Sequence, residues 1–473
     1  MMDHQVIQSP SASPKLHGPH VVVIGGGASG VLMATHLLSR QDVAFRVTII
    51  EGRHAPGRGV AYSTDDPDHL LNTRAHNMSA FPNDPGHFLN WLRTRSDGRG
   101  VTGQCFVSRS TYGSYLSSLI SPWLQGAGPQ RLRFVHQTAL RLQETPAGVV
   151  VHLGDGQSVI GDIAVLATGH VLEAPDPQGL LLGAWDDPDD FDRGARVVII
   201  GSGLSMVDRV ITLLKAGHRG EILCVSRRGQ LPRTHRPTKP LALTLAEIPL
   251  GAPMTVLIGW ARGLARQAEQ QGGTWRDAVD GIRPHVKAIW RNLPLAERSR
   301  FLRHAATWWD VHRHRIPPAS EATLQQAMAT GQMRVMRGSF LRAERLPGGQ
   351  AGARILPSGS ATPLILPATL IFDCRGIRRD PARHASPLIA DLLRRGSARV
   401  DPLNIGLDVG SSCRLLGKDD WASGKLFAIG PVSRAAFWEI TAIPDIREQT
   451  SRLAAVLALL SADARRANAR DKA

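Results

Sequence analysis

The sequence has few cysteines, few aromatic residues and no long hydrophobic run, and each shortage excludes a class of protein. The four cysteines form no CxxC pair, so we expect neither a metal site nor a dithiol redox centre; they are Cys105, Cys224, Cys374 and Cys413. No run of about 18 apolar residues is present, which argues against a membrane span. The N-terminal stretch lacks the apolar core of a secretory signal, so we expect a cytoplasmic protein.

Aromatic residues make up 5% of the 473-residue chain, whereas basic residues are abundant. Lys and Arg number 56 against 40 Asp and Glu, which gives a formal net charge of +16. A basic surface can bind nucleic acid, but the sequence contains no module that combines basic and aromatic residues. We therefore do not expect a nucleic-acid partner, and we expect some arginines to serve phosphate-bearing cofactors.

A glycine-rich turn near the N-terminus opens a βαβ unit. The segment VVVIGGGASG at 21–30 joins a strand over His20–Ile24 to a helix over Ala28–Arg40, and a second strand over Phe45–Ile50 ends at Glu51. This order is typical of a doubly wound α/β domain that binds a dinucleotide.

The residues of this turn match the needs of a pyrophosphate. Gly25 permits the sharp exit from the strand, Gly27 lets the pyrophosphate approach the backbone, and Gly30 lets the helix pack closely. The helix N-terminus then offers free amides. A carboxylate at Glu51 is placed to bind ribose hydroxyls. The predicted cofactor-binding residues of this unit are Gly25, Gly27, Ala28, Ser29, Gly30 and Glu51.

A second βαβ unit begins about 175 residues later with VVIIGSGLSM at 197–206, between strands predicted at Arg196–Ile200 and Glu221–Ser226. Its predicted phosphate-binding residues are Gly201, Ser202, Gly203 and Ser205, and Met206 replaces the third glycine. Arg227 and Arg228 stand where the first unit has Glu51, and guanidinium groups bind a 2′-phosphate. We therefore expect FAD in the first unit and NADPH in the second; the alternative is that both arginines are simply solvated.

The rest of the chain predicts an α/β fold with two Rossmann-like dinucleotide-binding domains and a helical insertion. Residues 1–19 form a loose tail, and residues 20–190 form the first part of the FAD-binding domain. Residues 191–365 form the NADPH-binding domain, with helical periodicity over about 240–335, and residues 366–473 return to the FAD-binding domain.

Several blocks of the sequence resemble the YdhS-like group of bacterial FAD/NAD(P)-binding proteins. The blocks are GGGASGVLMATHLL, GRGVAYSTDDPDHLLN, MSAFPNDPGHFLNWL, LATGH, GSGLSMVD, WWDVHRHR and WEITAIPDIREQ. This group is similar in layout to the two-dinucleotide-domain flavin monooxygenases, including N-hydroxylating enzymes. The resemblance implies further flavin contacts at Arg58, Gly59, Tyr62, Thr168, Gly169 and Gly430. Pro431 stands where such proteins often have Asp, so that contact departs from the pattern.

Outside the two glycine turns, the WWDVHRHR segment contains the highest density of aromatic, basic and acidic side chains. On one helix, His304, Trp308 and His312 would share a face, with Arg315 close to it, and could line a pocket for a carboxylate-bearing substrate. The alternative is an amphipathic helix whose tryptophans fill the core. Asn72, in a long loop after the first unit, either binds the flavin or substrate or forms a turn.

These features predict an FAD-containing, NADPH-dependent oxidoreductase. The resemblance favours a monooxygenase that uses a C4a-hydroperoxyflavin and molecular oxygen to hydroxylate a small amine or amino acid. The alternatives are a reductase or oxidase without oxygen insertion and a non-catalytic FAD-binding sensor. Flavin chemistry of this kind needs shielding more than a nucleophile. The motifs do not name a catalytic residue, the substrate or the oligomeric state.

Overall fold

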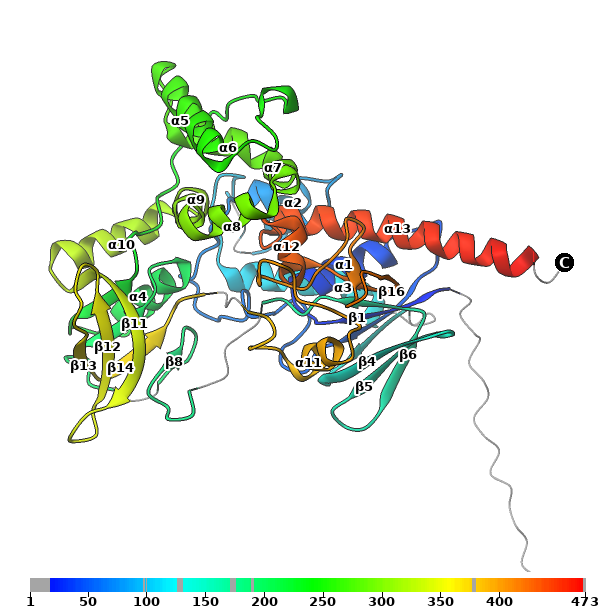
Figure 1. Ribbon diagram of the computed structural model, residues 1–473, viewed down its shortest axis with the longest axis horizontal. Coiled ribbons are helices and arrows are strands. Elements are labelled where there is room, and N and C mark those ends of the chain that lie inside the picture. Colours follow the sequence, from blue (N-terminus) through cyan, green and yellow to red (C-terminus); the bar gives the residue numbers. More distant parts are fainter. Residues whose placement is uncertain are drawn as a thin grey trace, which may run out of the picture.

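The computed structural model describes residues 18–96, 98, 100–125, 131–170, 176–188, 191–376 and 380–470. The tail predicted at 1–19 lies outside this part of the chain except for its last two residues. Two sheet domains lie side by side, and a group of helices lies over the junction between them (Figure 1). The predicted α/β class with two Rossmann-like units is confirmed.

The first sheet combines strands from both ends of the chain. Its order is β15 (Arg414–Leu416), β16 (Ala422–Ala428), β7 (Ile163–Leu166), β1 (His20–Ile24), β2 (Arg46–Ile50) and β3 (Leu132–Val135). All neighbours are parallel except β15 and β16. Strands β1, β2 and β7 are mostly apolar because both faces of a parallel sheet are covered.

Helices cover one face of this sheet and a small antiparallel sheet covers the other (Figure 1). Helix α1 (Ala28–Leu38) packs against α3 (Arg109–Gln125) and α13 (Ile443–Arg470). The small sheet contains β4 (Ala139–Thr145), β5 (Gly148–Leu153) and β6 (Ser158–Gly161), and α11 (Pro387–Arg394) packs on β4. Short helices α2 (His87–Arg93) and η1 (Ala75–Asn77) lie in the long loop region after β2.

The second sheet is built on the same plan. Its order is β13 (Leu364–Ala368), β12 (Ala351–Pro357), β11 (Met333–Arg345), β10 (Ile222–Ser226), β9 (Val197–Ile200), β14 (Leu370–Asp373) and β8 (Leu182–Gly183). The long strand β11 pairs parallel with β10 over its first part and antiparallel with β12 over the remainder. Helices α4 (Leu204–Lys215) and α10 (Pro318–Ala329) pack against each other beside it.

Two predicted boundaries of the second domain differ from the structure. Strands β8 and β14 pair into its sheet, so this domain reaches beyond the predicted range of 191–365 at both ends. Helix α10 packs on α4 and β11, so it is a crossover helix of the sheet and not part of the helical insertion. The sequence analysis did not predict β8, and helical periodicity could not show that α10 packs on this sheet.

The helical segment has its own apolar core. It contains η2 (Leu245–Glu247), α5 (Met254–Gln270), α6 (Trp275–Ile282), η3 (Arg283–His285), α7 (Val286–Asn292), α8 (Leu295–His304) and α9 (Ala306–Arg313). Trp290 of α7 stacks on Trp438 with ring centroids 4.8 Å apart and donates its Nε1–H to the Ala435 carbonyl at 2.7 Å. The short helices η4 (Gly430–Ser433) and α12 (Arg434–Phe437) thereby connect this core to the first domain.

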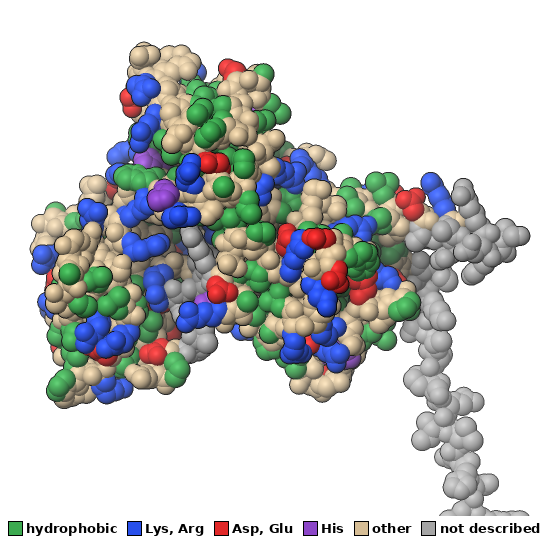
Figure 2. Space-filling model, in the orientation of Figure 1, with side chains coloured by type: hydrophobic (Ala, Val, Ile, Leu, Met, Phe, Trp, Pro, Cys, Tyr) green, Lys and Arg blue, Asp and Glu red, His purple; other side chains and the backbone are tan. Residues whose placement is uncertain are grey.

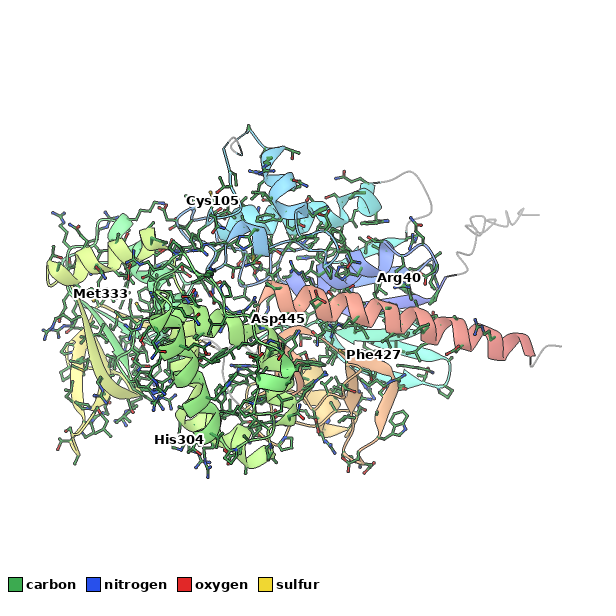
Figure 3. The ribbon with its side chains drawn as sticks, turned by 90° about the horizontal axis from the view of Figure 1, so that it is seen from above. Arg40, Cys105, His304, Met333, Phe427 and Asp445 are labelled. Carbon is green, nitrogen blue, oxygen red and sulfur yellow. The ribbon has the colours of Figure 1, made fainter. Side chains whose placement is uncertain are left out.

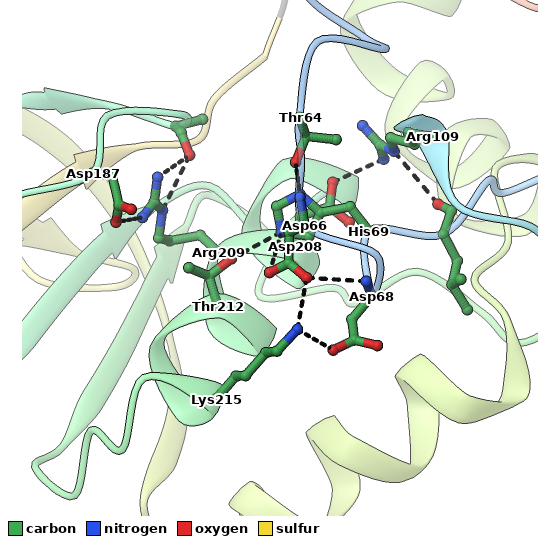
Figure 4. Close-up of polar contacts among 12 residues, drawn as sticks. Thr64, Asp66, Asp68, His69, Arg109, Asp187, Asp208, Arg209, Thr212 and Lys215 are labelled. Atoms are coloured by element: carbon green, nitrogen blue, oxygen red, sulfur yellow. Dashed lines mark hydrogen bonds and ion pairs between the residues drawn. The ribbon is translucent and has the colours of Figure 1, made fainter. Parts of the chain in front are cut away.

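A buried ion pair joins the two sheet domains. Arg109, the first residue of α3, places its Nη2 2.8 Å from Oδ2 of Asp208 on α4, and both side chains are nearly buried (Figure 4). Burial raises the pKa of Asp208, while the guanidinium of Arg109 opposes that rise. Because α4 begins at the second glycine turn, the pair fixes that turn relative to the first domain.

Polar contacts around this pair extend the junction. His69 Nδ1 lies 2.7 Å from the Thr64 hydroxyl, and its Nε2 lies 2.8 Å from the Thr212 hydroxyl on α4. Lys215, at the end of α4, contacts Asp66 at 3.0 Å and Asp68 at 2.7 Å (Figure 4). The loop after β2 thus lies directly along α4. We call residues 64–69 and Arg109, with the α4 residues they contact, the domain junction.

No helix in the described parts of the chain is both long and apolar enough to cross a membrane.

Removal of Arg109 tests how much the domain junction stabilises the fold. We expect Arg109→Ala to lower the free energy of unfolding by about 3 kcal/mol, because it leaves the Asp208 carboxylate buried without its partner. Chemical denaturation measures the change. The matched control is Lys215→Ala, which removes an exposed partner of the same loop and should cost much less. Equal decreases in the free energy of unfolding of the two variants would show that the buried pair stabilises the protein no more than the exposed one.

Candidate functional site

The first glycine turn is a narrow bend that only glycine can form. Gly25 has a φ of +112°, and a Cβ there would lie 2.3 Å from the Ala167 carbonyl oxygen. A Cβ on Gly30 would lie 1.9 Å from the Gly25 carbonyl oxygen, so α1 packs against the turn itself. These two contacts are the backbone approaches that the sequence pattern predicts.

Four segments that are distant in sequence converge on this turn. Glu51 accepts a hydrogen bond of 3.0 Å from the Gly26 amide, and the Thr168 backbone lies next to Gly25. A Cβ on Gly59 would lie 2.9 Å from the Gly27 Cα. The predicted residues Gly430 and Ser29 also meet, since a Cβ on Gly430 would lie 2.3 Å from the Ser29 hydroxyl. Gly169, with a φ of +71°, continues the turn after Thr168.

We call the first glycine turn and the start of α1 (residues 25–30), with the segments that converge on them at Glu51, Gly59, Thr168–Gly169 and Gly430, the first cradle. It has the features that a dinucleotide pyrophosphate requires. Helix α1 begins at Ala28, its N-cap is Gly27, and no described side chain caps its first amides. No acidic residue occurs in its first turn. Uncapped amides and the positive end of the helix dipole favour a phosphate there. The residues present therefore fit the phosphate groups of FAD.

Arg58 and Tyr62, predicted along the flavin, lie on the segment that approaches Gly27. Arg58 Nη2 donates to the Ser114 hydroxyl at 3.2 Å, and its Nη1 lies 3.5 Å from Asp65. The Tyr62 ring packs on Tyr112 of α3 with centroids 5.0 Å apart. Both side chains are thus held by the loop region that follows β2 and by α3.

The second glycine turn repeats the plan with one change. Gly201 has a φ of +119°, and a Cβ there would lie 2.3 Å from the Cys374 carbonyl oxygen. Ser202 donates its hydroxyl to that of Ser226 at 2.8 Å. Gly203 is the N-cap of α4, with no side-chain cap within the described chain and open space around its Cα. We call the second glycine turn and the start of α4 (residues 201–206) the second cradle, and it also fits a pyrophosphate.

Met206 shows how the second unit accommodates the missing third glycine. Its side chain is fully buried in the core between α4 and the second sheet. Ser205, in the first turn of α4, is partly exposed beside the uncapped amides. Helix α4 thus packs on the second sheet through the Met206 side chain, whereas the backbone of α1 itself packs against the first glycine turn.

Arginines lie beside the second turn, and the sequence pattern missed one of them. Arg227 is exposed, and none of the described residues forms a hydrogen bond or ion pair with its side chain. Arg228 donates to the carbonyls of His304 and Arg303, at the end of α8. Arg337 of β11 aligns with Ser226 in the sheet register, and its side-chain stem lies against Gly229. Only the pairing of β10 with β11 brings it there.

Figure 2 shows basic side chains along the hollow between the second domain and the rest of the molecule. Lys and Arg atoms line its visible wall on the side of the second sheet. A hollow with walls of one charge favours an anionic ligand.

The predicted substrate residues do not form one pocket. Helix α8 ends at His304 and α9 begins at Ala306, so His304 does not share a helix with Trp308 and His312. Trp308 is 50% exposed, and His312 donates to its carbonyl at 2.7 Å.

Arg315 and Asn72 lie apart from any shared pocket. Arg315 is buried in a bidentate pair with Asp280, at 3.1 and 2.7 Å. Asn72 lies at the contact between the domains, where its carbonyl accepts from His235 at 3.0 Å. Among the described residues, no three His, Cys, Asp or Glu side chains are placed to hold a metal ion.

A different part of the same segment contributes to a buried charge cluster. Glu439 is 5% exposed and accepts a hydrogen bond from Trp309 Nε1 at 2.6 Å. Arg313 Nε lies 3.2 Å from the other carboxylate oxygen of Glu439. Burial alone would raise the pKa of Glu439, but Arg313, His314 and Arg283 hold it below the usual value. We call Glu439, Arg313, His314, Arg283 and Arg434 the arginine cluster.

The arginine cluster carries more positive than negative charge. Arg313, Arg434 and Arg283 all act on His314, and burial with these charges lowers the pKa of His314 to about 4, against the opposing effect of Glu439. Arg283 also pairs with Asp445 at 3.4 Å, which Lys287 shares at 3.3 Å. Figure 3 shows Asp445 at the start of α13, beside the helical segment. Arg313 and Arg283 thus both act on the buried Glu439 carboxylate, and Arg283 is shared with Asp445.

The arginine cluster adjoins the first cradle through the chain. Arg434 follows Gly430 by four residues, and the same guanidinium helps to lower the pKa of His170, whose burial brings it to about 4. His170 directly follows Gly169 of the first cradle. Sequence analysis missed this cluster because its members come from three separate segments. The only signal was the density of Arg and His around WWDVHRHR.

Comparisons with known proteins identify the first cradle. Residues 22–171 match the FAD-NAD(P)-binding family model. No curated protein matches the sequence.

The whole fold is that of two-dinucleotide-domain flavoenzymes. The reduced form of ornithine hydroxylase from Pseudomonas aeruginosa is 14% identical with a TM-score of 0.62, covering 94% of this chain and 99% of its own. The FAD-bound cadaverine monooxygenase of Erwinia amylovora is 11% identical with a TM-score of 0.64, and 92% of each chain is covered. L-lysine 6-monooxygenase from Pseudomonas syringae is 14% identical with a TM-score of 0.61, covering 94% of this chain and 100% of its own. At these identities the likeness establishes a shared fold, and the narrower YdhS-like grouping stays a prediction.

Replacement of Glu439 by Gln tests the arginine cluster and its pH dependence. We expect Glu439→Gln to lower the free energy of unfolding by about 3 kcal/mol at pH 7, because it leaves the nearly buried Arg313 guanidinium without its carboxylate partner. The folded pKa of Glu439 lies below its unfolded value, so its stabilising effect is present above about pH 4.3 and is lost as the pH falls. The difference between the two proteins should therefore shrink in acid, as denaturation at pH 7 and near pH 4 would measure.

The control is Glu448→Gln, which removes an exposed carboxylate one helical turn after the start of α13. It should leave the stability almost unchanged at both pH values. A variant Glu439→Gln as stable as the wild type would contradict the view that this carboxylate neutralises the cluster.

Proposed function

We propose that the protein is an FAD-containing, NADPH-dependent monooxygenase that hydroxylates a small amine or amino acid. The observation that carries the proposal is the pair of uncapped glycine cradles, one on each parallel sheet, joined by a buried ion pair in a flavoenzyme fold. Three solved structures of that fold are named as hydroxylases or monooxygenases of ornithine, cadaverine and lysine. That naming supports the choice of a monooxygenase over an oxidase.

FAD would occupy the first cradle. Gly25, Gly27 and the amides at the start of α1 would hold the pyrophosphate, and Glu51 would accept hydrogen bonds from the ribose hydroxyls. The loop from Arg58 to Tyr62 and the turn at Gly430 would lie along the rest of the cofactor. The free amides of α1 and the match of residues 22–171 to the FAD-NAD(P)-binding model support this assignment.

NADPH would occupy the second cradle. Gly201 and Gly203 would admit its pyrophosphate, and Arg227 with Arg337 would bind the 2′-phosphate. The carboxylate that would select NADH in this position is replaced by arginine. A solved structure of similar fold, the ornithine N-hydroxylase of Kutzneria, contains reduced FAD and NADP⁺ together. That structure supports the two-cofactor arrangement.

The arginine cluster would bind the carboxylate of the substrate. Among the described residues the buried Nε of Arg283 has no hydrogen-bond acceptor, and a carboxylate entering the cluster would supply one. Burial lowers the pKa of His314 and of His170 to about 4, so neither adds charge near pH 7. An anionic head group fixed there would direct the amine of an amino acid toward the neighbouring first cradle.

Bound flavin would supply the transfer of two electrons from NADPH and the activation of molecular oxygen. The chain's own task is to bind both cofactors, to exclude water and to orient the amine. The domain junction keeps α4, and with it the second cradle, in one position against the loop after β2. The four described cysteines are all free, which suits work in the reducing cytoplasm.

Product coupling tests the proposed function. We expect the purified protein to be yellow, to oxidise NADPH, and to form hydroxylated product in step with NADPH use when the correct amine or amino acid is present. Rapid-mixing measurements against a panel of amines and amino acids would identify it. Hydrogen peroxide released in proportion to NADPH, with every panel member, would identify an oxidase instead. A colourless protein that takes up no flavin would refute the assignment.

Replacement of Arg337 tests the nucleotide preference. We expect Arg337→Ala to raise the KM for NADPH by about tenfold, because one charge-assisted hydrogen bond to a phosphate is worth about 1.5 kcal/mol. The KM for NADH should not change. The control is Arg334→Ala on the same strand, an exposed arginine that pairs with Glu221 and should affect neither nucleotide. An equal rise for both nucleotides would place Arg337 outside the 2′-phosphate site.

A further inference from the structure

All three tyrosines of the chain lie in one aromatic cluster beside the first cradle. The Tyr62 ring is 5.0 Å from that of Tyr112, and Tyr112 is 5.5 Å from Tyr115, measured between centroids. Tyr112 and Tyr115 are fully buried on α3. Trp91 of α2 follows, with its ring centroid 5.3 Å from Tyr115. Four easily oxidised side chains therefore form an unbroken series of contacts.

One end of the series lies at the proposed flavin site. Tyr62 donates its backbone N–H to the Gly59 carbonyl at 2.8 Å, and Gly59 abuts Gly27 of the first glycine turn. The other end approaches the surface. Trp91 is only partly buried, and the Arg95 guanidinium lies 5.1 Å from its ring centroid. The series thus runs from the cradle through the core to solvent.

Tyr115 differs from the other two tyrosines because a base accepts its proton. The Ala80 amide donates to the Tyr115 oxygen at 3.1 Å, so the phenolic hydrogen is free to point elsewhere. His87 Nδ1 lies 2.8 Å from the same oxygen, and in the tautomer with its proton on Nε2 it accepts the phenolic hydrogen. Burial lowers the pKa of His87, while Asp84 opposes this, so the imidazole is neutral near pH 7. Tyr115 and His87 thus form a hydrogen-bonded phenol–imidazole pair.

Tyr112 has no such acceptor. Within the described chain its buried hydroxyl makes no hydrogen bond. A phenol that loses an electron becomes strongly acidic and must release its proton to be stable. Oxidation can therefore pass through Tyr112 without resting there, whereas at Tyr115 the proton can move to His87. Because only Tyr115 has a proton acceptor among the described residues, oxidation that starts at Tyr62 comes to rest at Tyr115.

We propose that Tyr62, Tyr112, Tyr115 and Trp91 form a redox relay that carries oxidising equivalents away from the flavin site to the Tyr115–His87 pair and then to the surface. The proposal rests on the proposed function, since it assumes flavin in the first cradle. The relay would protect a site where oxygen is activated. An oxidant left there without substrate would be reduced by the chain before it attacked the residues around it.

Each step of the relay balances. A hydroxyl radical formed from oxygen at the flavin site takes one electron from Tyr62 and becomes hydroxide, and Tyr115 replaces that electron through Tyr112. The phenolic proton of Tyr115 moves to His87 Nδ1, which leaves a neutral tyrosyl radical and an imidazolium. A soluble thiolate then gives one electron through Trp91 and becomes a thiyl radical, and His87 returns the proton to Tyr115.

A blue-light flash on the flavin-loaded protein tests the relay, with the excited flavin as the oxidant. We expect quenched flavin fluorescence and a transient tyrosyl absorption band, and the chain's only tyrosines are the three of this cluster. Tyr115→Phe should shorten the lifetime of the tyrosyl signal by about tenfold, the scale of one hydrogen bond. Trp91→Phe should preserve the signal but slow its decay on addition of a thiol such as dithiothreitol.

Two controls separate this proposal from its alternatives. Trp421→Phe removes a tryptophan that is 62% exposed and outside the cluster, and it should change neither signal. His87→Gln keeps a hydrogen-bonding side chain but removes the base, and should shorten the tyrosyl lifetime as Tyr115→Phe does. Thermal melting confirms that each variant is folded. A yellow protein that shows no tyrosyl signal, or one unaffected by Tyr115→Phe, would overturn the relay, whereas a protein without flavin would refute the proposed function itself.

Discussion

The structure depends on the buried ion pair between Arg109 and Asp208. Each partner alone would be costly to bury, and their 2.8 Å contact makes both charges tolerable only when the two sheet domains are in this arrangement. The constraint acts on α4, the helix that begins at the second glycine turn. A single interaction thereby sets the position of one nucleotide cradle relative to the loop that borders the other. The proposed exchange of electrons between two cofactors would need such a fixed geometry.

Much of the fold followed from local patterns in the sequence. The strand His20–Ile24 was predicted with its observed limits, and β2, β9 and β10 within one residue of them, because apolar runs next to glycine turns are short-range signals. The roles of Gly25 and Gly30 also followed from chain geometry, since a side chain at either position would overlap backbone. The sequence also predicts a closing helix over 445–462, and this helix is confirmed within the longer α13.

Features that depend on distant pairing could not be predicted. Arg337 lies beside the second glycine turn only because β11 pairs with β10, more than a hundred residues earlier. The arginine cluster unites residues of η3, α9 and α12 with Glu439, and no periodicity links those segments. The helix predicted around WWDVHRHR is interrupted at Ala305, between α8 and α9. His304 and His312 therefore do not share a helical face, because one non-helical residue changes the direction of the side chains that follow.

The first sheet takes its strand β16 and the helix α13 from the last sixty residues of the chain, after the second domain and the helical segment have been made. During synthesis on the ribosome, the sheet that contains β1, β2 and β7 therefore keeps one edge unpaired until residues 414–470 have emerged. Gly430 and Ser29 meet only at that stage. The first cradle is therefore completed only after residues 414–470 have been made, and a chain that stops before them would contain the whole glycine motif without the segments that surround it.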